Sequence, residues 1–371
     1  MSTICDDVAR LHHSGGKIKL TTAQMGLFIV QMSTIYDVAE LAGVSAKTVS
    51  RVLNEDRAVK TNTRERVLEA MAKLEYRPNS QARQLRLGQT KTSVGMLLED
   101  PAGGYQGRFH HAMLMASMES GNYLAIELFE VDQTDYIADL ERFITDAQIK
   151  SMLLLPPLCD FGPIKSLLKA RNIHCVLISP TTPDDHYPSV AMDDRLAARN
   201  VTDYLLSLGH KTIAHIAGHP DHAAAFLRKQ GFYEAFDAIS KPRPHKDYIA
   251  EGYFTFKTGI TAAEQLLSLP VRPTAIFASN DEMAAATSSV AHKMGLRIPE
   301  DLSVIGFDDA PIASAVWPAL TTVRQPYLEM ARRALHILNG TGDNPQLSDI
   351  QSRHIIPHEI IVRESTGPVA P

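Results

Sequence analysis

The sequence predicts an α/β fold preceded by a small all-α part. Between residues 35 and 74, apolar side chains recur three and four positions apart, which is the spacing of helices buried on one face. From residue 92 onward, short apolar runs typical of strands alternate with helical patterns. This alternation builds parallel sheets with helices on both faces. Because roughly 280 residues exceed what one core usually spans, we expect two such sheets with a ligand crevice between them or at the strand ends.

The charge of the chain is distributed unevenly. The net charge of −5, taken alone, argues against a protein that binds nucleic acid. However, residues 32–91 hold 11 basic and 7 acidic side chains, a balance of +4, and the remainder has a balance of −9. A small basic part on a large acidic body is typical of an appended nucleic-acid-binding module.

Several classes of protein are excluded by composition. The three cysteines (Cys5, Cys159 and Cys175) are too few and too scattered for a disulfide framework or a zinc site, and they favour a reduced, cytoplasmic setting. The longest apolar runs, such as residues 151–157, are far short of a membrane span. We therefore expect no membrane partner, no metal and no cofactor.

The first 31 residues differ from the rest. They lack the features of a signal peptide. Met1-Ser2-Thr3-Ile4 recurs at residues 32–35, and Asp-Val-Ala follows in both places. We expect the natural domain to begin near Met32, with residues 1–31 a disordered leader or an over-extended start. Chance recurrence of a short string is the alternative.

Three short helices are predicted next. The first carries an apolar stripe made of Ile35, Val38, Ala39 and Ala42. Gly43 ends it, because glycine tolerates the positive φ of a tight turn. The second runs over residues 46–53, with Ser45 placed to cap it. The third contains Val67, Leu68, Met71 and Leu74, and Asn62 with Glu65 is positioned to cap its start.

Two helices joined by a glycine-containing turn form a helix-turn-helix, whose second helix enters the major groove of DNA. The second helix has one polar face, made of Ala46, Lys47, Ser50, Arg51 and Asn54. Arginine and lysine donate to guanine, and asparagine pairs with adenine. The alternative is a polar face that is merely solvated.

The body is predicted from seven strand-like runs, at residues 94–98, 123–129, 152–155, 175–178, 213–217, 275–278 and 304–307. Only the region from Asn339 onward, rich in Gly, Asp, Asn and Pro, is expected to be loose. No Walker-type or nucleophile-elbow motif occurs, which argues against an enzyme. His215, His219 and His222 are the best metal candidate, but Gly218 and Pro220 prevent one helix from holding all three.

At this point a family resemblance emerges. The matching segments are Ile35-Tyr36-Asp37-Val38-Ala39, Ala42-Gly43-Val44-Ser45, Thr48-Val49-Ser50-Arg51-Val52-Leu53-Asn54, Thr63-Arg64-Glu65-Arg66-Val67, Tyr76-Arg77-Pro78-Asn79, Gly209-His210, Ser279-Asn280-Asp281, Gly306-Phe307-Asp308-Asp309 and residues 320–325. Over about residues 32–364 the chain resembles the lactose-repressor/galactose-repressor (LacI/GalR) family of bacterial transcriptional regulators. The resemblance implies an N-terminal helix-turn-helix headpiece, a hinge helix and a two-subdomain periplasmic-binding-protein-like core of parallel sheets flanked by helices.

The resemblance also implies boundaries and DNA contacts. We expect a DNA-binding domain over residues 32–78, a hinge helix and linker over 79–91, a core for effector binding and dimerisation over 92–366, and a tail over 367–371. The expected DNA-binding residues are Tyr36, Ser45, Ala46, Lys47, Thr48, Ser50, Arg51, Asn54, Asn79, Arg83, Leu85 and Arg86. Leu85 matches a hinge leucine that wedges into the minor groove; the alternative is a core leucine. Lys60 stands where the family has a Ser or Thr cap, so Thr61 or Asn62 is expected to replace it.

The effector site is likewise implied by the resemblance. The expected polar contacts are Arg228, Asn280 and Asp308, whose donors and acceptors suit sugar hydroxyls. Phe254 and Tyr327 match ring positions, Asp193 is expected within reach, and Trp317 is expected to face the cleft on weaker grounds. The alternatives are a surface salt bridge for Arg228 or Asp308 and core packing for Phe254.

The sequence thus predicts a regulator, most simply a repressor of carbohydrate-utilisation genes that a sugar-type effector releases from pseudo-palindromic, double-stranded operator DNA. The C-terminus has no leucine heptad for a tetramer, so a homodimer is expected. The alternative is a sugar-binding or sugar-processing protein with a vestigial head, which an export signal or a catalytic dyad would favour.

Overall fold

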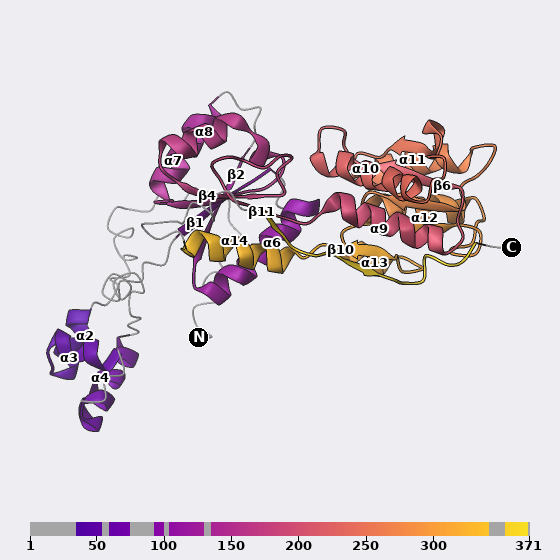
Figure 1. Ribbon diagram of the computed structural model, residues 1–371. Helices are drawn as coiled ribbons and strands as arrows, with labels where there is room; N and C mark the ends of the chain where they lie inside the picture. The colour runs from indigo at the N-terminus through magenta and orange to yellow at the C-terminus, as the bar shows by residue number, and fades with distance from the viewer. Residues whose placement is uncertain are drawn as a thin grey trace, which may run out of the picture. The chain divides into compact units, whose positions relative to one another are not determined.

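The computed structural model describes residues 35–53, 59–74, 93–99, 104–129, 135–340 and 353–369. The chain divides into two compact units, residues 1–90 and 91–371. Figure 1 shows the helices and strands of both units.

The first unit contains the predicted helix-turn-helix. Its helices are α2 (Ile35–Ala42), α3 (Ala46–Leu53) and α4 (Thr61–Lys73). Val38, Val49 and Val67, one from each helix, are fully buried against one another in a small core. Gly43 adopts φ +62 in the turn between α2 and α3. The Arg66 guanidinium of α4 donates to the carbonyl oxygens of Ala42 and Gly43, so the third helix fixes the turn.

The start of α4 corrects one expectation. Its N-cap residue is Lys60, and no side chain caps the helix. The prediction that Thr61 or Asn62 would replace the usual cap is therefore wrong, because Thr61 already lies inside the helix.

The second unit has two lobes, each built on its own sheet (Figure 1). Lobe 1 has a parallel six-stranded sheet in the order β11-β5-β4-β3-β1-β2. Its strands are β1 (Ser93–Leu98), β2 (Tyr123–Leu128), β3 (Ser151–Leu154), β4 (His174–Ile178), β5 (Ser189–Ala191) and β11 (Arg353–Ile355). Its helices are α6 (Gly104–Ser120), α7 (Tyr136–Asp146), α8 (Gly162–Ala170) and α14 (Tyr327–Gly340), with a 3-10 turn at Leu158–Asp160.

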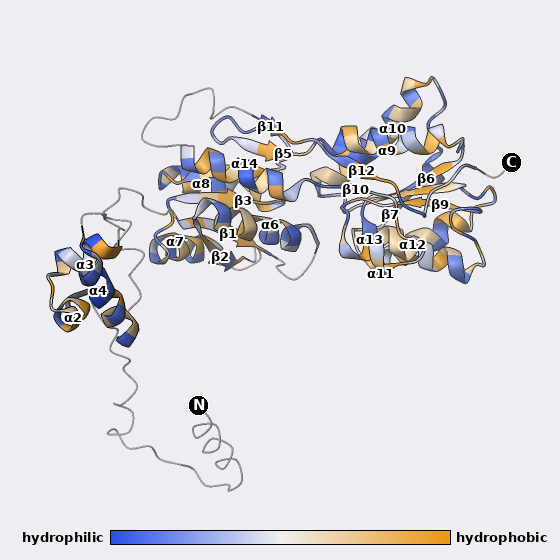
Figure 2. Cartoon of the chain, turned by 90° about the horizontal axis from the view of Figure 1, so that it is seen from below, coloured by the Kyte–Doolittle hydropathy of each residue, from blue (hydrophilic) through white to orange (hydrophobic). Residues whose placement is uncertain are grey.

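Lobe 2 has a parallel four-stranded sheet in the order β7-β6-β8-β9. Its strands are β6 (Ile213–Ala217), β7 (Ile249–Glu251), β8 (Ala275–Ala278) and β9 (Ser303–Ile305). Its helices are α9 (Asp194–Ser207), α10 (Ala223–Ala238), α11 (Phe256–Leu267), α12 (Asp281–Lys293) and α13 (Pro311–Ala315), with a 3-10 turn at Lys246–Tyr248. Strands β6 and β9 are largely hydrophobic in Figure 2, as strands covered on both faces must be.

The chain passes between the lobes more than once. β5 belongs to the sheet of lobe 1, and α9, which follows it directly, packs on α10 in lobe 2. β10 (Thr322–Arg324) and β12 (Glu359–Ile361) form an antiparallel pair. The expectation of a loose region from Asn339 onward is wrong for residues 353–361, where β11 extends the sheet of lobe 1 and β12 pairs with β10.

The expected α/β class is confirmed, and all seven predicted strands are present, within a few residues of their expected ends. In the part of the chain that the structure describes, no helix is long and apolar enough to cross a membrane.

Candidate functional site

A cavity of about 570 Å³ lies between the two lobes of the second unit. Lobe 1 contributes Gln106, Pro156 and Ser179, and lobe 2 contributes Arg228, Asn280 and Asp308. This volume is in the range of small-molecule sites, which favour a few convergent polar groups on an otherwise apolar wall. The cavity therefore brings together the three polar residues that the sequence analysis selected for an effector.

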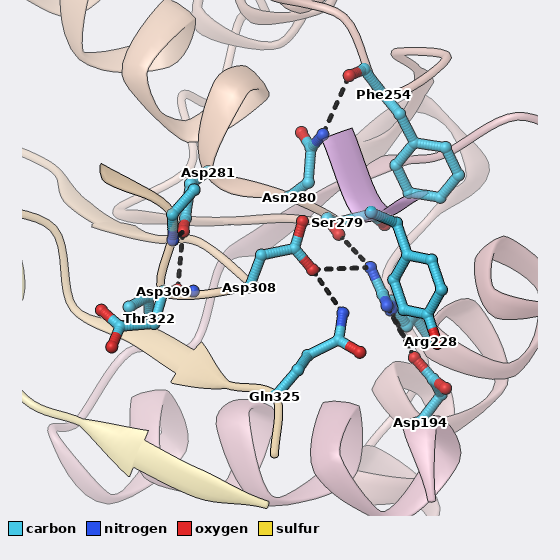
Figure 3. Close-up of polar contacts among 12 residues, drawn as sticks. Asp194, Arg228, Phe254, Ser279, Asn280, Asp281, Asp308, Asp309, Thr322 and Gln325 are labelled. Atoms are coloured by element: carbon cyan, nitrogen blue, oxygen red, sulfur yellow. Dashed lines mark hydrogen bonds and ion pairs between the residues drawn. The ribbon is translucent and has the colours of Figure 1, made fainter. Parts of the chain in front are cut away.

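Arg228 of α10 is held in one orientation by buried partners (Figure 3). Its Nε and Nη2 lie 2.8 and 2.7 Å from Asp194 Oδ1, and its Nη1 donates to the Ser279 carbonyl at 2.5 Å. The guanidinium also lies over the Phe307 ring, 3.7 Å from its centroid. Arg228 is only 4% exposed. Burial raises the pKa of Asp194, and the Arg228 charge opposes that rise.

Asp308 lies in the loop after β9, and its carboxylate is turned into the cavity. Its φ of +115 is unusual for a residue other than glycine and indicates a strained turn. Gln325 Nε2 donates to Oδ1 at 2.5 Å, and Arg228 Nη1 lies 4.0 Å from the same oxygen (Figure 3). Arg108 Nη2 donates to Oδ2 at 2.7 Å. Two hydrogen-bond donors and one more distant guanidinium charge thus orient the Asp308 carboxylate.

Asn280 both caps a helix and holds the backbone of Phe254. Its Oδ1 accepts from the Met283 N–H at the start of α12, and its Nδ2 donates to the Phe254 carbonyl (Figure 3). Phe254 has φ +63, and its ring stacks on His222 at 5.8 Å. A Cβ at Gly218 would lie 1.9 Å from Phe254 Cζ, so the ring packs against bare backbone.

Asp281 also belongs to the cavity lining, but its side chain faces away from Arg228 (Figure 3). Its carboxylate accepts from the Thr322 hydroxyl at 2.6 Å and from the Ala310 N–H at 2.7 Å. Burial, reinforced by the negative charge of Asp308, raises the pKa of Asp281 to about 8. This residue holds the turn that carries Asp308.

Three of the expected effector residues are placed differently. Asp193 caps α9 by accepting from the Leu196 N–H, and the next residue, Asp194, lines the cavity instead. Tyr327 lines an adjoining groove of about 1230 Å³ rather than the cavity itself. Trp317 is 80% exposed and belongs to neither lining, so the expectation that it faces the cleft is wrong.

The three candidate histidines do not converge. His215 is buried in β6, where its Nδ1 is 3.0 Å from the Phe277 carbonyl, and burial lowers its pKa to about 3. His219 and His222 lie in the following loop, with ring centroids 5.0 Å apart. Of these, His222 lines the cavity.

Sequence reasoning missed Asp194, Arg108 and Gln325. The sequence contained a signal for two of them: Asp194 adjoins Asp193, and Gln325 ends the matched segment 320–325. Arg108 carries no signal in the sequence, because α6 places it opposite Asp308 only after the lobes have folded.

The candidate DNA-reading surface lies in the first unit. On α3, Lys47 and Arg51 are exposed on the side opposite the buried Val49 and Val52. Ser45 accepts from the Thr48 N–H at 3.2 Å and so caps the helix as expected. Tyr36 is 73% exposed, and Ala46, Thr48 and Ser50 are half-buried. The remaining expected contacts, Asn54, Asn79, Arg83, Leu85 and Arg86, lie outside the described residues.

Comparison with known proteins gives matches for both the helix-turn-helix region and the two-lobed core. Residues 34–79 match the family described as bacterial regulatory proteins, lacI family, and residues 202–366 match the periplasmic binding protein-like domain. The HTH-type transcriptional repressor PurR of Vibrio cholerae serotype O1 (strain M66-2) is 34% identical over 314 residues, which cover 83% of this chain and 90% of that protein. The ribose operon repressor of Escherichia coli (strain K12) is 33% identical over 310 residues, which cover 83% and 92%.

A solved structure shows the same fold. The lac repressor dimer bound to operator and the anti-inducer ONPF has a TM-score of 0.73 and 26% sequence identity, covering 91% of this chain and 100% of that one. With relatives this similar over nine-tenths of their length, and with a helix-turn-helix and a two-lobed core in the matching places, the chain belongs to the lacI family of bacterial regulatory proteins.

Proposed function

We propose that this regulator represses genes of carbohydrate use and leaves its operator when a small sugar or sugar derivative binds between the lobes. The observation that carries the proposal is the convergence of Arg228, Asn280 and Asp308 on one cavity, in a chain that also carries the exposed Lys47 and Arg51 on a helix-turn-helix. The names of its relatives agree with this role: one is a ribose operon repressor, and another is a repressor solved on its operator.

The charges of the cavity favour an uncharged, polyhydroxylated ligand. Besides Asp281, whose pKa is raised to about 8, six acidic side chains and three guanidinium groups belong to its lining. Two of these guanidinium groups, on Arg228 and Arg108, already have carboxylate partners in Asp194 and Asp308. A phosphate ester would therefore meet a net negative wall, whereas hydroxyl groups both donate to carboxylates and accept from N–H groups.

The DNA contacts are part of the proposal. We propose that residues 32–78 read the operator through α3, with Tyr36, Ser45, Ala46, Lys47, Thr48, Ser50, Arg51 and Asn54 as contacts, and that residues 79–91 form a hinge with contacts at Asn79, Arg83, Leu85 and Arg86. The core would span residues 92–366. Two copies of a small DNA-binding domain bind a pseudo-palindromic operator far more tightly than one copy does, which supports a homodimer.

The proposed switch is reciprocal. An effector that closes the lobes shifts one lobe against its counterpart in the dimer, separates the two hinges and withdraws Leu85 from the minor groove. Because the coupling is a free energy shared by both sites, operator DNA must weaken effector binding by the same factor. The protein would act in the cytoplasm, where bacterial operators lie, and as a regulator rather than an enzyme.

A gel-shift titration tests the proposal. The full chain is titrated against DNA from the promoter beside its own gene and against an unrelated duplex, at fixed salt. Tighter binding to the promoter supports the repressor; equal binding to both duplexes contradicts it. Sugars that raise the thermal unfolding temperature are then added at saturation. Release of the promoter DNA supports the switch, and unchanged affinity with every such sugar rejects it.

A further inference from the structure

Arg108 of α6 reaches across the boundary between the lobes to Asp308. We propose that Arg108 is a positioning residue of the effector site. Its ion pair with Asp308, the interlobe clasp, holds lobe 1 to lobe 2 and fixes the carboxylate that the ligand contacts. The inference rests on the proposed function only in taking that ligand to be an effector.

The two partners of this ion pair belong to different lobes. Arg108 lies in the second turn of α6, which packs on α14 in lobe 1. Asp308 follows β9 of lobe 2, and its N–H donates to the Val323 carbonyl at 2.8 Å. The Ala310 N–H, two residues on, donates to Asp281. The backbone of Asp308 is thus fixed to lobe 2, and its carboxylate is bound to lobe 1 through Arg108.

Lobe 1 also orients the guanidinium of Arg108. Its Nε donates to the Tyr327 hydroxyl at 3.3 Å, and its Cζ lies 5.5 Å from the centroid of the Tyr327 ring. Tyr327 begins α14, so the donor group is held by α6 and α14 together. Because Tyr327 restricts its orientation, the Arg108 guanidinium approaches Asp308 from one fixed direction, unlike a mobile surface side chain.

The two oxygens of Asp308 have different partners. Oδ2 accepts from Arg108 at 2.7 Å, and Oδ1 accepts from Gln325 and faces Arg228. The side chains of Arg108 and Asp308 are only 24% and 9% exposed, so their attraction is screened less than that of a surface pair. An ion pair across a hinge biases the lobes toward the arrangement in which it forms.

Arg108 is also well placed to respond to a ligand. It lines the cavity and the adjoining groove, so it stands in the wall between them. Any ligand group that donates to Asp308 lies beside Arg108. Binding at Asp308 and the closure of the lobes are therefore linked through one carboxylate.

Distance measurement between the lobes tests the clasp without a ligand. Lys169 of α8 and Lys257 of α11 are exposed and lie in different lobes. Both are replaced by cysteine for spin labelling, with Cys5→Ser, while the buried Cys159 and Cys175 are left in place. Pulsed EPR distances are then compared among the parent chain and its Arg108→Gln, Arg108→Lys and Arg332→Gln variants.

Arg332→Gln is the matched control. Arg332 pairs with Glu119 at 2.8 Å, joining α14 to α6 within lobe 1. We expect Arg108→Gln to lengthen or broaden the distance distribution by about 2 Å or more. Arg108→Lys should restore most of the parent distribution, because it keeps the charge, and Arg332→Gln should match the parent.

An Arg108→Gln distribution that coincides with the parent overturns the clasp, provided that circular dichroism shows both to be folded. If Arg108→Gln does not fold, the comparison of Arg108→Lys with Asp308→Asn decides: equal distributions overturn the clasp, and a longer one for Asp308→Asn supports it. Failure of the promoter gel shift would instead remove the repressor function and leave this distance result standing.

Discussion

The Asn280 side chain donates from Nδ2 to the Phe254 carbonyl at 2.8 Å, across 26 residues of sequence. Because Oδ1 is used on the Met283 N–H, both polar atoms of Asn280 have partners within the protein. Phe254 has φ +63, which is costly for a bulky residue, and the Asn280 amide is what meets its carbonyl. Asn280 therefore shapes the cavity wall by holding Phe254, in addition to any contact with the ligand itself.

The first prediction concerns Asn280→Asp. The substitution keeps the oxygen that caps α12 but places a carboxylate oxygen against the Phe254 carbonyl, where a donor had been. Since Asn280 is 7% exposed, we expect the free energy of unfolding to fall by about 1–3 kcal/mol. Urea unfolding at neutral pH measures it. Asp193→Asn, the reverse exchange at the cap of α9, is the control and should change stability little. Equal losses for both would contradict the role assigned to the Phe254 contact.

The sequence was sufficient for elements whose pattern is local. The glycine turn and the apolar spacing around it predicted α2 and α3, and the apolar runs predicted seven strands, of which all but the edge strand β2 are largely buried in the two sheets. It missed β5, β7 and β10–β12, which are three residues long and depend on neighbouring strands for their definition. β11 and β12 also follow a polar segment, so their pairing is visible only after folding.

The site was predictable to a similar extent. Arg228, Phe254, Asn280 and Asp308 line the cavity, as expected. Asp193 was off by one residue: at a helix start, neighbouring side chains point in different directions, so one carboxylate caps α9 while the next meets Arg228. Trp317 is near Asp308 in sequence but lies beyond α13 with its side chain in solvent. Such differences of direction are set by tertiary packing.

The second prediction tests the reading helix. Lys47 is exposed at the start of α3, and we expect Lys47→Ala to weaken binding to the promoter DNA by about 1–3 kcal/mol through a lost contact with a base. Fluorescence anisotropy at one salt concentration measures it. Lys73→Ala is the control, because Lys73 of α4 pairs with Glu69 at 3.1 Å. An equal loss on an unrelated duplex would make Lys47 a phosphate contact and reject its role in base recognition.

The third prediction concerns the proposed homodimer. Leu114, Met115 and Met118 lie on one face of α6 and are exposed by 44%, 41% and 71%. An apolar helix face of this kind is costly in water unless a partner covers it. We expect Met118→Lys to shift the chain from dimer to monomer, measured by sedimentation velocity, and to weaken promoter binding in parallel. Val271→Lys, at an exposed apolar residue of lobe 2, should leave the dimer intact. A dimeric Met118→Lys variant would place the interface elsewhere.

The fourth prediction is the pH dependence of stability at Asp281. Burial raises the pKa of this carboxyl from 3.8 to about 8, so between these values the folded chain keeps a proton that the unfolded chain has lost. The contribution of Asp281 is complete below about pH 4 and is lost as the pH rises to about 8, with a slope of about 1.4 kcal/mol per pH unit at most. Asp281→Asn does not titrate, and its oxygen still accepts from the Ala310 N–H. The variant should therefore gain stability relative to the parent chain between pH 5 and pH 8 in urea unfolding.

Asp146→Asn, at the exposed end of α7, controls for loss of a carboxylate at the surface. A constant difference between Asp281→Asn and the parent across this range would show that Asp281 is ionised in the folded protein, with the Thr322 and Ala310 donors outweighing its burial.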